Sequence, residues 1–511
     1  MQASSRVIYN TFFLYAKMLL SIVVNIFTTR ILLEGLGISD YGIYSVVGGA
    51  ISMLGFLSAS MSTTTQRFLN VSEGSNDNNR TVLVFANAII IHCILSLVII
   101  IMLLFAGYFF FNGVLAIPEE RLDASIIVYV CLIISTAFSV AIAPYDGVLN
   151  AHEDLHVYSL IGILDCLIKF LIALAIRQAE IDRLILYGIS MAAASWLIRY
   201  LTKRYCCRKY SECKINSPWK FYDKSLVKNM VGFAGWNLLN TSSAMITLYS
   251  MNLIINHYYG VTYNAAMGVA TQLTGVLMAF SLNMLKALSP IMMKREGANN
   301  RESVLSLTYI GSKFAFIIFA IMSLPIYFCL DWILGIWLVD VPEYTSVFCK
   351  LLIVSILLEQ YFVFLSQAIM AQGDVKKYCI CKSIVNSFPI FSSIFMCSIG
   401  FSVSWVIVNR IVFYVLMGGM VNLYYCKRNL GLSYLVYIRK TMLPTIVSTG
   451  IIVCIAIMTI ENTLLSHIVK FITIFLLSVT FYYLLSLEKK EKCQLSMVIN
   501  NLMNKRNKTN I

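Results

Sequence analysis

Long apolar runs, separated by short polar segments, recur along the chain from Val7 to Leu487. A helix needs roughly 20 apolar residues, at about 1.5 Å each, to cross the hydrocarbon core of a bilayer. The pattern therefore predicts an all-α polytopic membrane protein with fourteen transmembrane helices. The predicted spans are 7–33, 42–69, 82–111, 123–149, 157–177, 183–202, 226–256, 264–288, 304–334, 345–371, 376–398, 402–426, 442–460 and 464–487.

Lys and Arg gather in alternate loops between these spans. The loops after the sixth, eighth and twelfth spans and the C-terminal tail are basic, whereas the loops on the other side are neutral or acidic. Cytoplasmic loops of membrane proteins carry an excess of Lys and Arg, so both termini are predicted to be cytoplasmic. The first span is too long for a signal peptide and no small-x-small cleavage site follows it, so we expect it to be retained.

Short sequence matches recur in the same order at an offset of 220 residues. Gly48, Ala50, Gly55, Ala151, Asp154 and Tyr158 match Gly268, Ala270, Gly275, Ala371, Asp374 and Tyr378. Six spans separate the two copies, so both enter the bilayer from the same side, which indicates a parallel pseudo-repeat. The predicted parts are an N-lobe (1–202), a basic cytoplasmic linker (203–225), a C-lobe (226–426), helices 13 and 14 (427–487) and a basic cytoplasmic tail (488–511).

Composition excludes several classes of protein. Of the 511 residues, 59% are hydrophobic and only 13% are charged, against about a quarter charged in soluble domains. The net charge of +14 comes from residues that set topology, so we expect no nucleic-acid partner. The sequence contains no nucleotide-binding, metalloprotease or nucleophile-elbow motif. No pair of His or Cys residues completes a zinc-like site. We therefore expect no enzyme activity, metal or cofactor.

Polar side chains form stripes on the first helix of each predicted lobe. The stripes comprise Asn10, Lys17, Ser21, Asn25 and Thr28 on helix 1, and Asn229, Trp236, Asn240, Ser243 and Thr247 on helix 7. At 100° per residue the first set lies within about 80° of arc. Lipid-facing helices have no reason to carry such stripes, which therefore predict the walls of a hydrated central cavity. Polar contacts between packed helices are the alternative for part of the set.

Ionisable residues inside the spans are the second signal. They are Lys17, His92, Asp165, Lys169, Lys313, Glu359 and Arg410, with Arg30, Lys286 and Lys350 nearer span ends. Asp165 and Lys169 are four residues apart, as in a helical ion pair, and Lys350 can extend to the outer interface. A lone His92 is more often a core histidine with satisfied hydrogen bonds than a proton relay.

The remaining cations have no obvious carboxylate neighbour in the sequence. A charge near the bilayer centre costs roughly 2.5–3.5 kcal/mol on insertion scales, which disfavours a dry location. Arg and Lys suit phosphate oxygens, so a cationic cavity for an anionic substrate is predicted. Its candidate residues are Lys17, Asn25, Arg30, Asn240, Lys286, Lys313 and Arg410. Asp165 and Glu359 are the central carboxylates that a proton or sodium site would use, and ion coupling stays open.

Several local sequences match a known group of transporters. These are Thr29-Arg30-Ile31-Leu32, Leu36-Gly37, Asp40-Tyr41-Gly42-Ile43-Tyr44, Thr64-Thr65-Gln66-Arg67 and Gly147-Val148-Leu149-Asn150-Ala151. With a 6+6+2 arrangement of spans, the chain resembles the polysaccharide-exporting bacterial flippases (the O-antigen flippase family) of the multidrug/oligosaccharidyl-lipid/polysaccharide exporter superfamily. The resemblance covers essentially the full length.

This resemblance implies a specific activity. The protein would flip an undecaprenyl-pyrophosphate-linked oligosaccharide repeat unit (O-antigen, capsule or exopolysaccharide) from the cytoplasmic to the periplasmic leaflet of the bacterial inner membrane. Alternating access would carry the head group through the cationic cavity, with Lys17 and Arg30 on helix 1 facing it. A polysaccharide polymerase and a chain-length regulator are the implied protein partners.

Two other transport functions stay open. A multidrug exporter of the same superfamily would favour an acidic or aromatic cavity for cationic drugs. A flippase of the lipid-linked peptidoglycan precursor would share the architecture and the pyrophosphate. A membrane polymerase or ligase needs a sizeable periplasmic loop with catalytic residues, and no predicted outer loop is long enough.

The place of Lys17 on the helix 1 stripe generates a prediction. Lys17→Ala should impair export without impairing membrane insertion, and Lys17→Arg should retain more export than Lys17→Gln, because the role assigned to Lys17 is electrostatic. Export by correctly inserted variants, quantified as surface polysaccharide, measures this. Equal losses in Lys17→Arg and Lys17→Gln would argue against a role for the charge.

Overall fold

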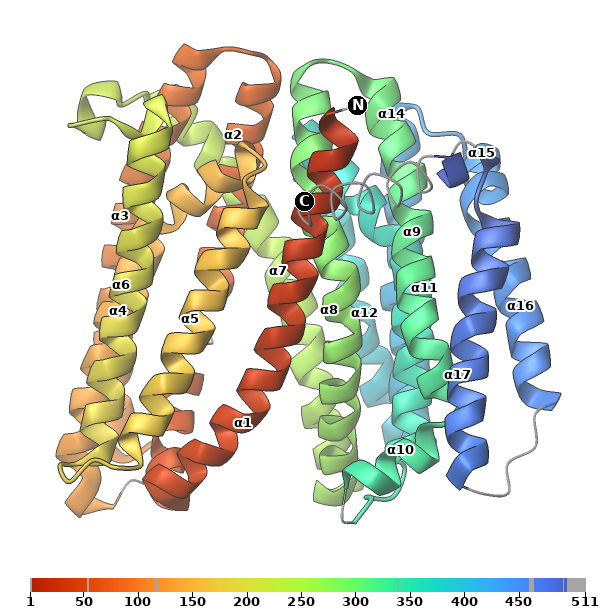
Figure 1. The fold of residues 1–511 in the computed structure, drawn as a ribbon, viewed down its shortest axis with the longest axis horizontal. Helices are drawn as coiled ribbons and strands as arrows, with labels where there is room; N and C mark the ends of the chain where they lie inside the picture. Colours follow the sequence, from red (N-terminus) through yellow and green to blue (C-terminus); the bar gives the residue numbers. More distant parts are fainter. Residues whose placement is uncertain are drawn as a thin grey trace, which may run out of the picture. The chain divides into compact units, whose positions relative to one another are not determined.

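The computed structural model describes residues 2–52, 55–114, 118–338, 340–458, 464–489 and 491–493. Helices of α, 3-10 and π type account for the regular structure of these residues (Figure 1). Thirteen helical stretches among them are long and apolar enough to cross a membrane. The prediction of an all-α polytopic membrane protein is confirmed. The chain divides into two compact units, Tyr9–Leu238 (the N-unit) and Leu239–Ile511 with Met1–Ile8 (the C-unit).

The first seven long helices run from the start of the chain through the N-unit and into the C-unit. They are α1 (Gln2–Ser52), α2 (Gly55–Gly74), α3 (Asn78–Phe109), α4 (Leu122–Ala151), α5 (Leu155–Ile176), α6 (Arg183–Lys209) and α7 (Lys224–Tyr259). Short turns η1 (Phe110–Val114), η2 (Glu119–Arg121), η3 (Ser211–Cys213) and η4 (Pro218–Phe221) lie between them. The N-unit ends within α7, so this helix contributes to both units.

The other helices belong to the C-unit. They are α8 (Val261–Gly297), α9 (Arg301–Phe328), α10 (Leu330–Trp337), α11 (Thr345–Gln372), α12 (Lys376–Ser398), α13 (Ser404–Asn409), α14 (Gly418–Leu430), α15 (Tyr434–Tyr437), α16 (Leu443–Met458) and α17 (Leu464–Phe481). Three π-helical segments continue α13, α15 and α17: η5 (Arg410–Met417), η6 (Ile438–Met442) and η7 (Tyr482–Ser486).

The thirteen apolar stretches coincide with every predicted span except the second. Over 42–69 the structure has the end of α1 and most of α2, with residues 53 and 54 outside the described part. Helix α2 is rich in Ser and Thr, which lowers its hydropathy, yet Thr64, Thr65 and Asn70 are almost fully buried. These polar side chains are sheltered by α3 and α4, against which α2 packs. A helix surrounded by protein in this way does not need an apolar surface.

The basic segment between the two predicted lobes is partly ordered against the N-unit. Helix α6 continues to Lys209, seven residues beyond its predicted end. Lys209 and the Tyr210 hydroxyl both donate to Asp154, and the His152 ring stacks on Tyr210 at 4.0 Å. Burial raises the pKa of Asp154, but these two hydrogen bonds outweigh it and hold the pKa below its ordinary value. The segment is therefore anchored by charge to the loop between α4 and α5.

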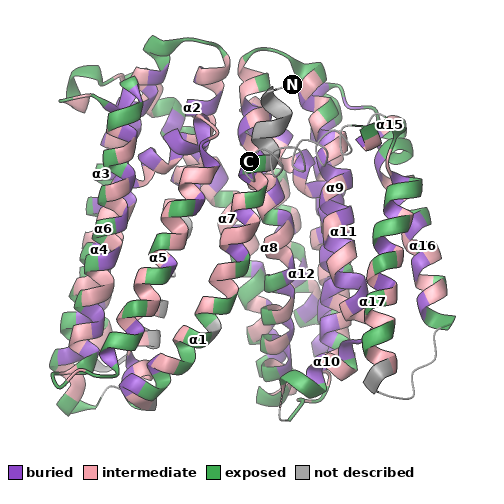
Figure 2. Ribbon diagram, viewed as in Figure 1, coloured by how far each residue is buried: buried purple, intermediate pink, exposed green. Residues whose placement is uncertain are grey.

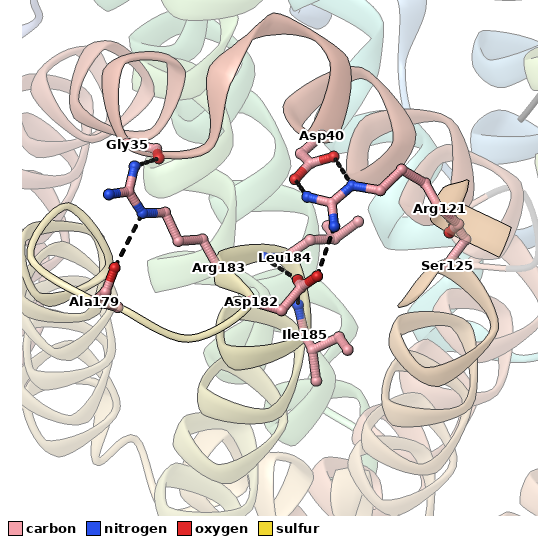
Figure 3. Close-up of polar contacts among 9 residues, drawn as sticks. All are labelled: Gly35, Asp40, Arg121, Ser125, Ala179, Asp182, Arg183, Leu184 and Ile185. Atoms are coloured by element: carbon pink, nitrogen blue, oxygen red, sulfur yellow. Dashed lines mark hydrogen bonds and ion pairs between the residues drawn. The ribbon is translucent and has the colours of Figure 1, made fainter. Parts of the chain in front are cut away.

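A second polar cluster lies at the other end of the N-unit helices (Figure 3). Gly37 has φ 81°, a conformation that favours glycine, and it kinks α1. Three residues later Asp40 accepts a hydrogen bond from Arg121 at 2.9 Å, and Arg121 also donates to Asp182 at 2.6 Å. Asp182 caps α6 by accepting from the Leu184 backbone N–H. The cluster thus ties the kink of α1 to the starts of α4 and α6.

The C-unit is packed around α11 (Figure 2), in which most residues are buried, as are almost half of the residues of α9. The ring of Phe364 on α11 fits against Gly311 of α9, where a Cβ atom would lie 2.5 Å from the ring. Phe362 fits in the same way against Gly419 of α14. These glycines let the helices approach closely enough for the rings to fill the core. The close packing holds α11 rigidly beside α9 and α14.

A buried ion pair joins α9 to the segment after η7. Both carboxylate oxygens of Glu491 accept from the Lys313 ammonium at 2.9 Å. The Lys313 side chain is only 2% exposed and that of Glu491 only 8%. A charge that is buried this deeply requires its partner, so Glu491 fixes the end of the described chain to α9.

This pair predicts a large loss of stability in Glu491→Gln. The variant leaves the Lys313 ammonium buried without a counter-charge, which should cost about 3–5 kcal/mol and lower the melting temperature in detergent. Lys313→Met/Glu491→Leu should recover most of the loss because it removes both charges. Lys350→Gln, which breaks an exposed pair with Asp331, is the control and should cost at most about 1 kcal/mol. A double variant no better than Glu491→Gln would contradict the explanation.

Candidate functional site

A cavity of about 320 Å³ lies within the C-unit. It is enclosed by α7, α8, α11, α12, η5 and α14, and both polar and apolar side chains line it. Asn240 of α7 and Ser281 of α8 are in the lining. The first two helices of the predicted C-lobe therefore do contribute polar walls to a cavity.

A charged cluster lies at this cavity. Arg410 at the start of η5 donates to Glu359 of α11 at 3.0 Å and to the Ser355 hydroxyl. Its guanidinium lies 5.1 Å from the centre of the Tyr414 ring, and the Lys382 ammonium lies 5.7 Å from the same ring. Glu359, Lys382 and Tyr414 line the cavity. Among these described residues two cations, Arg410 and Lys382, thus stand against one carboxylate, Glu359, with which Arg410 pairs.

Among the described residues of the lining Lys382 is the one cation, and the sequence analysis did not name it. It lies close to the basic start of α12, beside Lys376 and Lys377, where a lysine is expected at the membrane interface. The spacing of polar residues along the helix indicates its position, because Tyr378, Lys382 and Asn386 are four residues apart and therefore share one face of α12. All three line the cavity.

Amide oxygens form another part of the lining. The side-chain carbonyl oxygens of Asn240, Gln360 and Asn386 are buried and accept no hydrogen bond from the described residues. The side-chain amide of Gln360 donates to the backbone carbonyl oxygen of Ile356, and that of Asn386 donates to the Ser243 hydroxyl. Buried acceptors are costly to leave unpaired. They are available to hydroxyl or N–H donors of a bound molecule.

Two other polar residues of the α7 stripe, Ser243 and Thr247, have a packing role. The Thr247 hydroxyl donates to the backbone carbonyl oxygen of Asn386 at 2.6 Å, and the Ser243 hydroxyl accepts from the Asn386 side-chain amide at 3.2 Å. Both contacts join α7 to α12. For Ser243 and Thr247 the alternative interpretation, polar contact between packed helices, fits the structure.

In the N-unit, the predicted cavity residues are dispersed along α1. The Lys17 ammonium lies 4.4 Å from the centre of the Tyr158 ring, and its side chain passes directly over Gly162 of α5. Asn25 is exposed. Arg30 is also exposed and pairs with Glu34 at 3.2 Å, so the prediction that it has no carboxylate neighbour is wrong. Glu34 is one helical turn away, the spacing of an ordinary surface pair.

In the C-unit, the structure brings together some of the predicted residues. Asn240 and Glu359 line the cavity and Arg410 binds Glu359 beside it. Lys286 of α8 is not among the lining residues. Lys313 is bound to Glu491 at a different cleft, so the prediction that it faces the substrate cavity does not fit its position.

The predicted coupling carboxylates are both engaged in ion pairs. Asp165 pairs with Lys169 at 2.8 Å, as the spacing of four predicts, and Glu359 pairs with Arg410 at 3.0 Å. The described residues contain no group of three His, Cys, Asp or Glu side chains arranged to hold a metal ion.

Residues 237–395 match the MatE family model. The fold is similar to that of several solved transporters. A MATE structure in complex with MaD3S is 16% identical, with a TM-score of 0.69, over 83% of this chain and 96% of that chain. An outward-facing multidrug resistance MATE family transporter of the MOP superfamily is 13% identical, with a TM-score of 0.68, over 84% and 96% of the two chains.

A third similar structure is a MOP superfamily transporter from Pyrococcus furiosus, for which a reverse polarity of the binding pocket suggests a different function. It is 14% identical, with a TM-score of 0.68, over 84% of this chain and 97% of that chain. No curated protein matches this sequence. Residues 237–395 are therefore similar to the MatE family, and the fold is of the MATE type. These similarities do not single out the polysaccharide-exporting branch.

Proposed function

We propose that this protein is a membrane transporter that flips an undecaprenyl-pyrophosphate-linked oligosaccharide repeat unit from the cytoplasmic to the periplasmic leaflet of a bacterial inner membrane. The observation that carries the proposal is the charge of the C-unit cavity, where Arg410 pairs with Glu359, the carboxylate among the described lining residues, and Lys382 adds a second cation. Because Glu359 is already paired with Arg410, and no described carboxylate forms an ion pair with Lys382, the Lys382 side chain is left for a ligand. An ammonium in such a site suits phosphate oxygens.

The neutral lining supports a hydroxylated head group. Asn240, Gln360 and Asn386 present acceptor oxygens that sugar hydroxyls can donate to. Phe362 and Tyr414 add aromatic surface beside these amides. A sugar attached to a phosphate combines both chemistries in one molecule.

The proposed mechanism is alternating access. The hydrophilic head group crosses through the protein while the lipid chain remains in the bilayer, as in transporters built from two related bundles that rock against each other. In the N-unit, Lys17 supplies an ammonium held over Tyr158. Coupling to an ion gradient, both termini in the cytoplasm, and cooperation with a polysaccharide polymerase and a chain-length regulator belong to the same proposal.

The second candidate is a multidrug exporter, which the comparisons favour. The similar structures include a multidrug resistance MATE family transporter, and the cavity does contain a carboxylate, Glu359, that would attract a cationic drug if Arg410 released it. The two candidates therefore differ in the sign of the charge that the substrate carries. A flippase of the peptidoglycan precursor shares the anionic chemistry and differs in the mass of its lipid-linked sugar.

A strain lacking the gene provides the decisive test. We expect polyprenyl-pyrophosphate oligosaccharides to accumulate on the cytoplasmic face and surface polysaccharide to be lost, with both effects reversed by plasmid-borne wild type. Mass spectrometry of the extracted lipid would identify the repeat unit. Unchanged lipid pools and polysaccharide, together with altered sensitivity to cationic dyes, would instead assign the protein to drug export.

Lys382 variants test the recognition of phosphate. Lys382→Gln should reduce the restored surface polysaccharide by about tenfold or more, because a hydrogen bond to a charged group contributes about 1.5–3 kcal/mol. Lys382→Arg should retain more function. Lys350→Gln, in the same unit but paired with Asp331 away from the cavity, is the matched control. Full function of correctly inserted Lys382→Gln would remove the cavity charge from the mechanism.

A further inference from the structure

A second cleft, of about 460 Å³, lies in the C-unit where α9, α15, η6, α16 and η7 meet. Its polar lining includes Lys313, Arg439, Lys440 and Glu488. It shares no lining residue with the cavity described above. The proposed transport function makes no use of it.

The available charge of this cleft is positive. The Lys313 ammonium donates two hydrogen bonds to Glu491, which neutralises its charge, so Lys313 adds no net charge to the cleft. Arg439 and Lys440 are exposed on η6, and no described carboxylate forms an ion pair with either of them. Glu488 is the carboxylate in the lining. Two available cations thus face one opposing charge.

Apolar side chains surround these cations on the outside of the helices. Leu435 is 75% exposed, and Ile438, Leu443 and Leu485 are also largely exposed. They belong to the stretches Tyr434–Met458 and Ser466–Ser486, which are apolar enough to cross a membrane. Exposed leucines on such helices face acyl chains. Arg439 and Lys440, near the start of the first stretch, then lie at the level of the lipid head groups, where long cationic side chains reach the interface.

We propose that this cleft binds the phosphate of an anionic phospholipid head group. Basic pockets between membrane helices recognise such head groups. The flanking leucines favour a phospholipid over a soluble phosphate because they offer contact surface to its acyl chains. The bound lipid contacts η6 and the start of α16, the end of η7, and α9, and so stabilises the packing of these helices.

Thermal unfolding of the full-length protein in detergent tests this proposal. Phosphatidylglycerol should raise the melting temperature more than phosphatidylcholine does, because a ligand that binds only the folded state stabilises it. Arg439→Gln/Lys440→Gln should weaken the apparent affinity for phosphatidylglycerol roughly thirtyfold, at about 1 kcal/mol for each cation. The control is Lys376→Gln/Lys377→Gln, another adjacent pair of exposed lysines in the C-unit, which should keep the wild-type response.

Three results would overturn the proposal. Equal shifts with phosphatidylglycerol and phosphatidylcholine would exclude recognition of the head-group charge. Equal weakening in both double variants would show attraction to net charge alone. A shift with inorganic phosphate as large as that with phosphatidylglycerol would mark a soluble-anion site. If the double variant does not fold, Arg439→Gln and Lys440→Gln singly should each weaken the affinity about fivefold.

Discussion

The cost of a charge surrounded by apolar helices governs this structure, because an ionised side chain away from water has to be paired or placed at a wet surface. Lys313 and Asp165 follow the first course, bound to Glu491 and Lys169 respectively. Arg410 does so too, and its pairing with Glu359 removes the one carboxylate of the cavity lining from competition for a ligand. The charge of the cavity therefore depends on this single pair.

Lys17 and Lys382 follow neither course completely, and their surroundings are alike. Each lies near a tyrosine ring, Tyr158 or Tyr414, and the end of each side chain lies over a glycine, Gly162 for Lys17 and Gly418 for Lys382. Gly162, beneath Lys17, corresponds to Lys382 at the repeat offset of 220. The two units thus present one lysine each, but from different helices: the first helix in the N-unit and the fifth helix of the repeat in the C-unit. A tyrosine face stabilises a cation without neutralising it, which fits the proposed role of both lysines in binding an anionic head group.

Features with a local signal in the sequence were predictable. Hydropathy located thirteen of the spans, and a spacing of four identified the pair of Asp165 and Lys169. The same spacing joins Arg30 to Glu34, which lies one residue beyond the end of the predicted first span. Lys313 and Glu491 are 178 residues apart, and no spacing rule connects them. Helix α2 escapes hydropathy because its polar side chains are buried against protein, which only the tertiary structure shows.

The choice between an anionic and a cationic substrate follows from how firmly Arg410 holds Glu359. The similar structures, at 13–17% identity, define the fold and leave the cavity chemistry to this chain's own residues. Arg410 is also fixed by Ser355 and lies over Tyr414, so it has three partners to lose if it moves. Releasing Glu359 to a cationic drug would therefore strand a guanidinium that is 12% exposed, whereas binding a phosphate at Lys382 disturbs none of these contacts. This contrast is the reason why we propose an anionic substrate for the cavity.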